Sequence, residues 1–242
     1  MTGGGRWEPS APVVVVVGHY GVGKTNLSLN LAFDARERGS AVALVDLDVV
    51  NPYFRSSGSR ALLEERGVRL VAPVFAGTNL DGPSLSPEVP AAIEWARAAP
   101  GRVAVVDAGG DDAGATALGR FADAVAAGPY EMLYVVNRSR NLTQDPAGAA
   151  EVLREVEAAS RLRATAVVNN THLKGDTDLE TIRRGIPFAE EVARASGLPL
   201  AFTTAPTALA DVLADRQNDR FRQTDGGCGA YPVRVYVRTP WE

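Results

Sequence analysis

Cysteine, lysine and long apolar runs are scarce in this sequence of 242 residues. The single cysteine, Cys228, cannot form an internal disulfide, and the chain offers no paired Cys or Cys/His spacing for a zinc site or a cluster. We therefore expect a reducing, cytoplasmic environment and assign no redox role to Cys228. Lysine occurs only at Lys24 and Lys174, so arginine supplies nearly all of the positive charge.

No apolar run approaches the roughly 20 residues that span a bilayer, and the first ten residues lack the basic and apolar blocks of a signal peptide. These absences argue against a membrane or secreted protein. The net charge of −4 argues against a protein that mainly neutralises nucleic-acid phosphates. Acidic residues interrupt Arg216, Arg220 and Arg222, so we interpret this stretch as a solvated helix face.

Short β-branched runs alternate with longer segments of helical period, a pattern typical of strand–helix–strand units in a parallel sheet. Because the strand runs are continuously apolar, both faces of the sheet should be covered by helices. The pattern predicts buried strands at 13–17, 41–46, 68–71, 103–107, 132–136, 164–168 and 200–203, and a half-exposed edge strand at 233–237. It predicts helices at 24–38, 60–66, 90–98, 114–126, 146–161 and 179–196, the last one with an interruption point at Pro187.

This element order predicts a three-layer α/β/α fold with a mostly parallel, doubly wound sheet and a C-terminal edge strand. We expect one domain over residues 13–242, preceded by a flexible N-terminal tail at 1–12. Two stretches, 75–90 and 217–231, are rich in Gly, Pro or polar residues and are predicted to be loops.

The strongest motif is GHYGVGKT at 18–25, which matches G-x-x-x-x-G-K-[ST] and lies between a predicted strand and a predicted helix. Its glycines allow backbone N–H groups to approach phosphate oxygens at a helix N-terminus. Lys24 should reach the β- and γ-phosphates, and Thr25 should bind Mg²⁺. The predicted nucleotide contacts are Gly18, His19, Tyr20, Gly21, Val22, Gly23, Lys24, Thr25 and Asn26.

Carboxylates follow two of the predicted strands. Asp46 and Asp48 come at the end of the second strand, where ligands bind in open α/β sheets. One of them can orient a water and the other can support the metal or the loop, and Asp46 is included among the candidate metal ligands; the alternative is that both only terminate the strand or cap the next segment. Asp107 ends the fourth strand and suits Mg²⁺ coordination, and Gly110 can donate its N–H to the γ-phosphate.

Together these three elements resemble the MinD/ParA group of the SIMIBI class of P-loop NTPases, over residues 13 to about 213. The resemblance implies an ATPase that is often dimeric and switches a protein partner according to its nucleotide. It also implies that Asp48 positions the attacking water and that Asp107 is the Walker B aspartate. By the same resemblance Asn169, with Asn170 as the alternative, and Pro206 hold the adenine.

The sequence departs from this family at one position of the P-loop. There the family carries a second lysine, directly after the first glycine, that reaches the nucleotide of the dimer partner. His19 occupies this position and Tyr20 replaces the next small residue. Since histidine is a weaker activator than lysine at neutral pH, cross-dimer activation is in question. The alternative is that both residues pack on the nucleotide or on the dimer face.

Base preference follows from a missing motif. Guanine-specific P-loop proteins usually carry N/T-K-x-D, and neither NRSR at Asn137 nor NNTH at Asn169 supplies it. ATP is therefore favoured over GTP. His172, in the second of these segments, has no second histidine nearby, and we expect no metal role for it.

Two loops are predicted to respond to the nucleotide, at 51–56 and at 110–116. Tyr53, Phe54 and Arg55 in the first loop are of types enriched at interface hot spots, with core packing as the alternative for the aromatics. Asp111 and Asp112 in the second loop are expected to be solvated or to cap a helix.

The leading hypothesis is a cytoplasmic, Mg²⁺-dependent ATP-binding protein with slow hydrolysis, which forms a homodimer and switches an unknown protein partner. Membrane and nucleic-acid partners are not expected. Two alternatives stay open. One is a nucleotide-responsive binding module with negligible hydrolysis. The other is a small-molecule kinase or ATP-dependent ligase, in which the 75–90 loop would shape a substrate pocket.

Overall fold

The computed structural model describes residues 7–48, 57–72, 87–110, 112–140, 145–215 and 229–237. The P-loop and both aspartate-bearing strand ends lie inside these ranges. Several predictions concern residues outside them: the 51–56 loop, most of the 75–90 loop, Asp111, Cys228, and the arginines at 216, 220 and 222.

An eight-stranded parallel sheet forms the centre of the described structure, in the order β3-β2-β4-β1-β5-β6-β7-β8. All five residues of β1 are buried, as a strand covered on both faces requires. Because β1 lies between β4 and β5, the order of the strands reverses beside it, which is where open α/β sheets bind ligands. The strands are β1 (Val13–Val17), β2 (Ala41–Leu47), β3 (Val68–Val71), β4 (Arg102–Ala108), β5 (Glu131–Val136), β6 (Ala166–Asn169), β7 (Leu200–Pro206) and β8 (Ala230–Val233).

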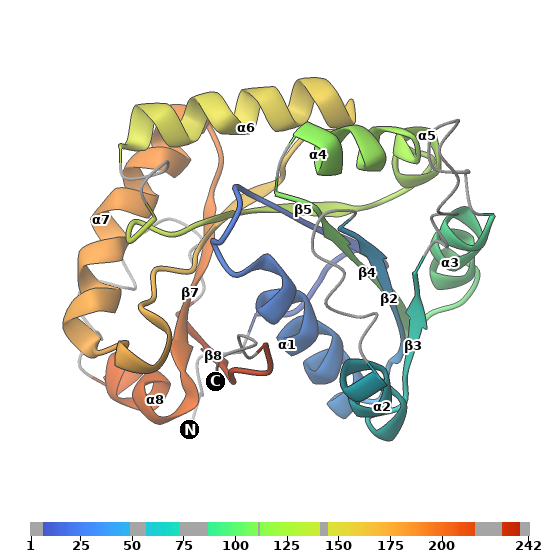
Figure 1. Cartoon of the computed structure of the whole chain (residues 1–242), viewed down its shortest axis with the longest axis horizontal. Coiled ribbons are helices and arrows are strands. Elements are labelled where there is room, and N and C mark those ends of the chain that lie inside the picture. Colours follow the sequence, from blue (N-terminus) through green and yellow to red (C-terminus); the bar gives the residue numbers. More distant parts are fainter. Residues whose placement is uncertain are drawn as a thin grey trace.

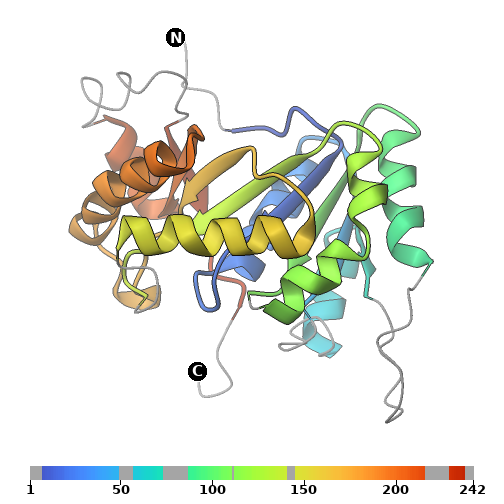
Figure 2. The same cartoon turned by 90° about the horizontal axis from the view of Figure 1, so that it is seen from above.

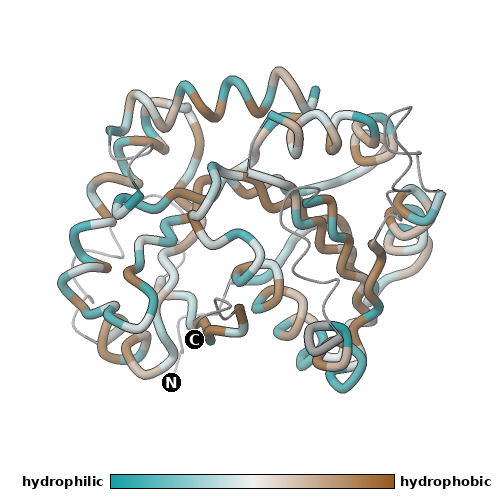
Figure 3. Tube along the Cα trace, viewed as in Figure 1, coloured by the Kyte–Doolittle hydropathy of each residue, from teal (hydrophilic) through white to brown (hydrophobic). Residues whose placement is uncertain are grey.

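Helices cover both faces of this curved sheet (Figure 1). The concave side holds α1 (Lys24–Glu37) and α2 (Ser57–Glu65), which pack with the even-numbered valines of β1. The odd-numbered valines face the convex side, where α4 and α6 lie in front of the strands in Figure 2. That side is covered by α3 (Glu88–Arg97), α4 (Asp112–Gly119), α5 (Ala122–Ala126), α6 (Pro146–Ser160) and α7 (Leu179–Ser196). Hydrophobic residues accordingly concentrate on the strands (Figure 3).

The predicted fold class is confirmed, and the structure divides one predicted helix and adds one that was not predicted. The single helix expected at 114–126 is two helices, α4 and α5. The first ends at Gly119, a residue of low helix propensity that lets α6 approach closely, since a Cβ atom there would lie 2.5 Å from the Ala159 carbonyl oxygen. In contrast, α7 continues through Pro187, since the helix buries apolar residues on both sides of it, Ile182 and Val192 among them. The additional helix α8 (Thr207–Asp215) was not predicted; nine residues show too few turns for a clear period.

The edge strand lies earlier in the chain than predicted, at Ala230–Val233 instead of 233–237. After β8, the backbone N–H groups of Arg234 and Tyr236 donate to the side-chain oxygens of Asn30 and Asn26 on α1, both at 2.8 Å. The ring of Tyr236 also packs edge-on against Phe33, 4.9 Å between centroids. Residues 234–237 therefore run alongside α1 and do not extend the edge strand. The C-terminal segment is thus bonded directly to the helix that begins at the end of the P-loop.

The segment before β1 also packs on the sheet. The ring of Trp7 lies 5.1 Å from that of Phe202 on β7, and the Ser10 hydroxyl donates to the Glu131 carboxylate at the start of β5. Residues 1–6 of the tail lie outside the described ranges. The N-terminal end of the described chain thus contacts β7 and the start of β5, and the C-terminal end contacts α1.

Candidate functional site

The loop at 18–25 connects β1 to α1, so the P-loop motif has the structural context that the sequence predicted. Gly18, Gly21 and Gly23 have φ angles of +150°, +76° and +91°, in a region that favours glycine. A Cβ atom on Gly18 would lie 2.4 Å from the Val135 carbonyl oxygen of β5, which glycine alone avoids. The loop therefore bends tightly enough to direct backbone N–H groups toward an anion at the N-terminus of α1.

Lys24 lies in the interior of this loop, with 6% of its surface exposed. Its Nζ donates to the His19 carbonyl oxygen at 3.2 Å. The same Nζ would be 2.5 Å from a Cβ atom on Gly110, and the Tyr20 backbone nitrogen would be 2.7 Å from it. The P-loop and the segment after β4 thus touch through a glycine, as required if both contact the same phosphates.

The three predicted carboxylates meet beside the loop. Asp46 on β2 and Asp107 on β4 are direct partners in the parallel register, and both are buried. The Asp48 backbone N–H donates to Asp46 Oδ1 at 3.0 Å, and the charge of Asp48 acts on Asp107. Spacing along the sequence had indicated the two strand ends, and the sheet order places them side by side.

Asp107 is the most perturbed of these groups. Burial raises its pKa to about 6, against the opposing effects of Lys24 and of hydrogen bonds from Thr25 and Ser28. Ser28 Oγ donates to Asp107 Oδ1 at 3.0 Å, whereas Oδ2 is buried without a hydrogen-bond partner. Ser28 was not predicted as a site residue; its place one helical turn after Thr25 is the signal that could have found it.

A buried carboxylate oxygen without a partner fits a cation that the residues would hold when nucleotide binds. Thr25, Asp46 and Asp107 are the residues that would supply oxygen donors to such an ion, and Mg²⁺ typically takes one or two carboxylates and keeps several waters. Within the described ranges, no group of three or more His, Cys, Asp or Glu side chains is arranged to hold a metal. Hydroxyl and carboxylate oxygens are hard donors, which suit Mg²⁺ better than a transition metal that prefers nitrogen or sulfur ligands.

The two asparagines after β6 have different surroundings. Asn169 is fully buried, and its Oδ1 accepts from the Thr171 hydroxyl at 2.8 Å. Asn170 Nδ2 donates to the Val22 carbonyl oxygen at 2.7 Å, and its Oδ1 accepts from the Thr204 hydroxyl. Asn170 therefore links the P-loop to β6 and β7, and the adenine contact assigned to Asn169 stays a prediction.

Three other predicted contact residues differ in their surroundings. Pro206 ends β7 at the same edge of the sheet and is partly buried. Tyr20 has 59% of its surface exposed, so its ring is accessible from solvent. Asn26 directs its side-chain amide to the C-terminal segment, where Nδ2 donates to the Arg234 carbonyl oxygen at 2.9 Å.

Two side chains that the sequence had not assigned to the site pack against the P-loop. Arg140, after β5, has its Nε 3.7 Å from the position of a Cβ atom on Gly21. His172, after β6, has its Nε2 2.9 Å from the corresponding position on Gly23. Neither loop carries a recognisable motif, so only the sheet order brings these residues to the nucleotide site.

His172 makes stability depend on pH with a defined sign. Burial, with the charges of Arg140 and Lys174, lowers its pKa from 6.5 to about 4. Between pH 6.5 and 4 the unfolded chain binds a proton at this histidine that the folded chain does not. The contribution of His172 to the free energy of unfolding is therefore fully present above pH 6.5 and is lost as the pH falls toward 4. The loss is on the order of 3 kcal/mol. We expect His172→Gln to flatten this part of the curve of unfolding free energy against pH, measured by urea denaturation.

Titrating carboxylates are common to the wild type and His172→Gln, so their contributions cancel when the two curves are compared as differences. A His172→Gln curve parallel to that of the wild type between pH 4 and 6.5 would contradict the assignment.

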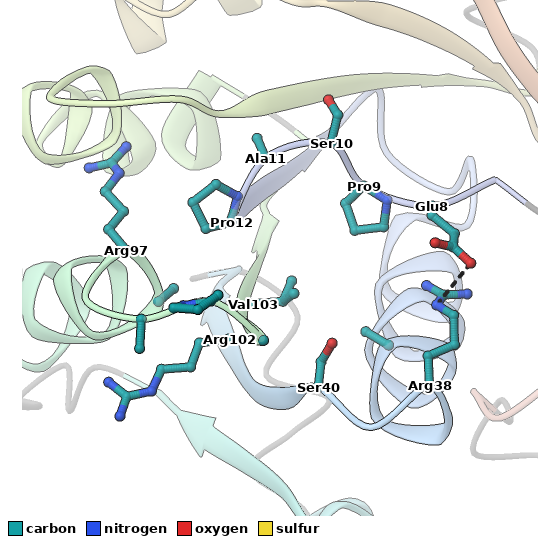
Figure 4. Close-up of a pocket in the computed structure, with 15 residues that line it drawn as sticks. Glu8, Pro9, Ser10, Ala11, Pro12, Arg38, Ser40, Arg97, Arg102 and Val103 are labelled. Atoms are coloured by element: carbon teal, nitrogen blue, oxygen red, sulfur yellow. Dashed lines mark ion pairs between the residues drawn. The ribbon is translucent and has the colours of Figure 1, made fainter.

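A cavity of about 470 Å³ lies at the opposite edge of the sheet, near the amino ends of β1 and β4 (Figure 4). Its arginines already have partners. Arg38 pairs with Glu8 at 3.7 Å, Arg97 donates to three backbone carbonyls, and Arg102 lies over the Trp95 ring. Because these charges are engaged and the P-loop is at the other edge, we do not include this cavity in the functional site.

The fold and the site define a P-loop NTPase domain. The family model CbiA, described as the CobQ/CobB/MinD/ParA nucleotide binding domain, matches residues 13–202. This match covers more than half of the chain, so the protein belongs to that family and is a nucleotide-binding domain of the MinD/ParA class. Comparison with curated proteins gives no match.

Solved structures with the same fold come from signal recognition proteins. The 54 kDa signal recognition particle protein of Aeropyrum pernix K1, in complex with GDP, is 21% identical with a TM-score of 0.56, over 81% of this chain and 42% of that one. FtsY of Thermotoga maritima is 20% identical with a TM-score of 0.55, over 84% and 65%. This chain thus spans about two fifths to two thirds of their length, and the likeness concerns the fold. In the described ranges no helix has the length and apolar character to cross a membrane.

Proposed function

We propose that this protein binds ATP with Mg²⁺, hydrolyses it slowly, and acts as a dimeric, nucleotide-dependent switch on a protein partner. One observation carries the proposal: buried Lys24, Gly110 and the unpartnered Asp107 oxygen meet at one edge of the sheet. The proposal is supported by the closeness of a cation, a backbone N–H and a carboxylate able to bind a metal ion, which are the groups that phosphoryl chemistry needs. Family membership supports the nucleotide, and the missing N/T-K-x-D motif supports adenine.

The residues have separate roles in this proposal. Lys24 and the P-loop N–H groups stabilise phosphate charge, and Asp48 orients the attacking water. Thr25 and Asp107 would hold Mg²⁺, with Asp46 beside them, and the ion would neutralise charge on the phosphates. Gly110 would donate its N–H to the γ-phosphate. The segment after β4 would therefore change conformation when hydrolysis removes the γ-phosphate.

The test combines size and chemistry. Light scattering after size exclusion gives the molar mass in five samples that contain Mg²⁺. One has no nucleotide, and the others have ADP, ATP, a non-hydrolysable ATP analogue or GTP. Phosphate release is assayed in the same samples. We expect a dimer with ATP and its analogue, slow phosphate release, and a weaker response to GTP. A monomer in every sample would contradict the dimeric switch, and an equal response to GTP would contradict the adenine preference.

Asp48→Ala separates binding from hydrolysis. Because Asp48 is proposed to orient water and not to hold phosphate, the variant should bind ATP within about threefold of the wild type while phosphate release falls by about a hundredfold. Asp112→Ala, at an exposed carboxylate after β4, is the matched control and should leave both quantities unchanged. Wild-type turnover in Asp48→Ala would remove Asp48 from this role.

A second candidate is a binding module in which ATP orders the dimer without appreciable hydrolysis. The observation that favours it is His19, where the family carries its second lysine, beside an exposed Tyr20. Nucleotide-dependent dimerisation without phosphate release would support this function over the first. His19→Lys should then raise phosphate release, because lysine is fully cationic at neutral pH.

A further inference from the structure

Arg140 is held beside the P-loop by a fixed turn. Its backbone N–H donates to the Asn137 carbonyl oxygen at 3.1 Å, and the Ser139 N–H donates to Asn137 Oδ1 at 2.9 Å. Asn137 is fully buried at the end of β5, next to the strand that carries the P-loop. The turn therefore fixes where the Arg140 side chain leaves the sheet.

The Arg140 side chain lies over the glycine in the middle of the loop. Its Nε is 3.7 Å from the position of a Cβ atom on Gly21, and its Cζ is 4.0 Å from that position. The Nε atom is buried and has no hydrogen-bond partner. A buried N–H donor without an acceptor is costly, and it points to an acceptor that a ligand supplies.

The surroundings leave the positive charge of Arg140 available. The charge of Arg140 acts on His172, whose pKa is lowered by burial and by the neighbouring cations, so His172 is neutral at pH 7. The carboxylates Asp46 and Asp107 lie on β2 and β4, on the other side of β1 from the turn after β5. Within the loop itself Lys24 is the only lysine or arginine, whereas a nucleoside triphosphate brings about four negative charges.

We propose, resting on the function proposed above, that Arg140 is a further phosphate-binding residue that donates to the phosphate chain of the bound nucleotide at Gly21. Guanidinium groups bind phosphate through two parallel hydrogen bonds, and such charge-assisted bonds are stronger than neutral ones. Arg140 would act from the opposite side of the loop to the carboxylates and balance the phosphate charge there.

The experiment measures dissociation constants by calorimetry for ATP, ADP and inorganic tripolyphosphate, the last of which lacks base and sugar. The variants are Arg140→Gln and Arg140→Lys, with Arg138→Gln as the matched control. Arg138 belongs to the same turn, but its side chain is exposed. Thermal unfolding without ligand is recorded for each protein.

We expect Arg140→Gln to weaken ATP and ADP binding by about tenfold to a hundredfold, and tripolyphosphate binding by a similar factor. Arg140→Lys keeps the charge but loses the second hydrogen bond, so it should lose less affinity. Arg138→Gln should bind as the wild type does. Unfolding temperatures without ligand should agree among all four proteins, because no bond of the Nε atom is lost.

Three results would overturn the proposal. Arg140→Gln could bind all ligands as tightly as Arg138→Gln does. It could lose affinity for ATP but not for tripolyphosphate, which would place the contact on ribose or base. Both Arg140 variants could unfold at lower temperature in proportion to their lost affinity, which would make the residue structural. Absence of ATP binding by the wild type would instead overturn the proposed function itself.

Discussion

Lys24→Ala should abolish nucleotide binding, with dissociation constants for ATP and ADP rising by about a hundredfold or more. Lys24 is buried, and its ammonium group is held by the His19 carbonyl oxygen next to Gly110. Alanine removes the cation from the place where phosphate charge would gather, and no other lysine or arginine of the loop replaces it. Calorimetric titration of the wild type and of Lys24→Ala with ATP and with ADP measures the effect.

Lys174→Ala is the control, because Lys174 is the only other lysine and is exposed. Unchanged ATP affinity in Lys24→Ala, with a folded protein, would contradict both the site and the proposed function.

Asp107→Asn should stabilise the ligand-free protein and weaken its Mg²⁺-dependent binding and hydrolysis of ATP. Without ligand, burial raises the pKa of Asp107 from 3.8 to about 6, so the ionised carboxylate opposes folding. This group favours the folded state fully below pH 3.8, and that contribution is lost as the pH rises through about 6. At pH 7.5 the neutral amide should therefore stabilise the ligand-free protein by about 2–3 kcal/mol.

The same substitution should remove the gain in ATP affinity that Mg²⁺ gives and lower phosphate release by about a hundredfold. Urea denaturation at pH 7.5 measures the first effect, and titration of ATP with and without Mg²⁺ measures the second. Asp112→Asn changes an exposed carboxylate and should alter neither. A destabilised Asp107→Asn that still shows the full effect of Mg²⁺ would contradict the placement of the ion.

The sequence by itself determined the central strands and the loop between the first strand and helix. Continuous valine runs such as 13–17 are buried wherever the strand lies in the sheet, so composition predicts them. The glycines at 18, 21 and 23 are needed by the backbone of the loop itself, which makes the motif local and readable. The aspartates at the ends of β2 and β4 were predictable for the same reason, as polar residues that end apolar runs.

Only the tertiary structure decided which other side chains join the loop. Ser28 hydrogen-bonds to Asp107 across 79 positions, and Arg140 and His172 reach the loop from turns after β5 and β6. The residues 234–237 look like a strand, but their backbone bonds to α1 through Asn26 and Asn30. Each of these contacts depends on the order of strands in the sheet, and hydrophobic periodicity predicts that a strand is buried without specifying its neighbours.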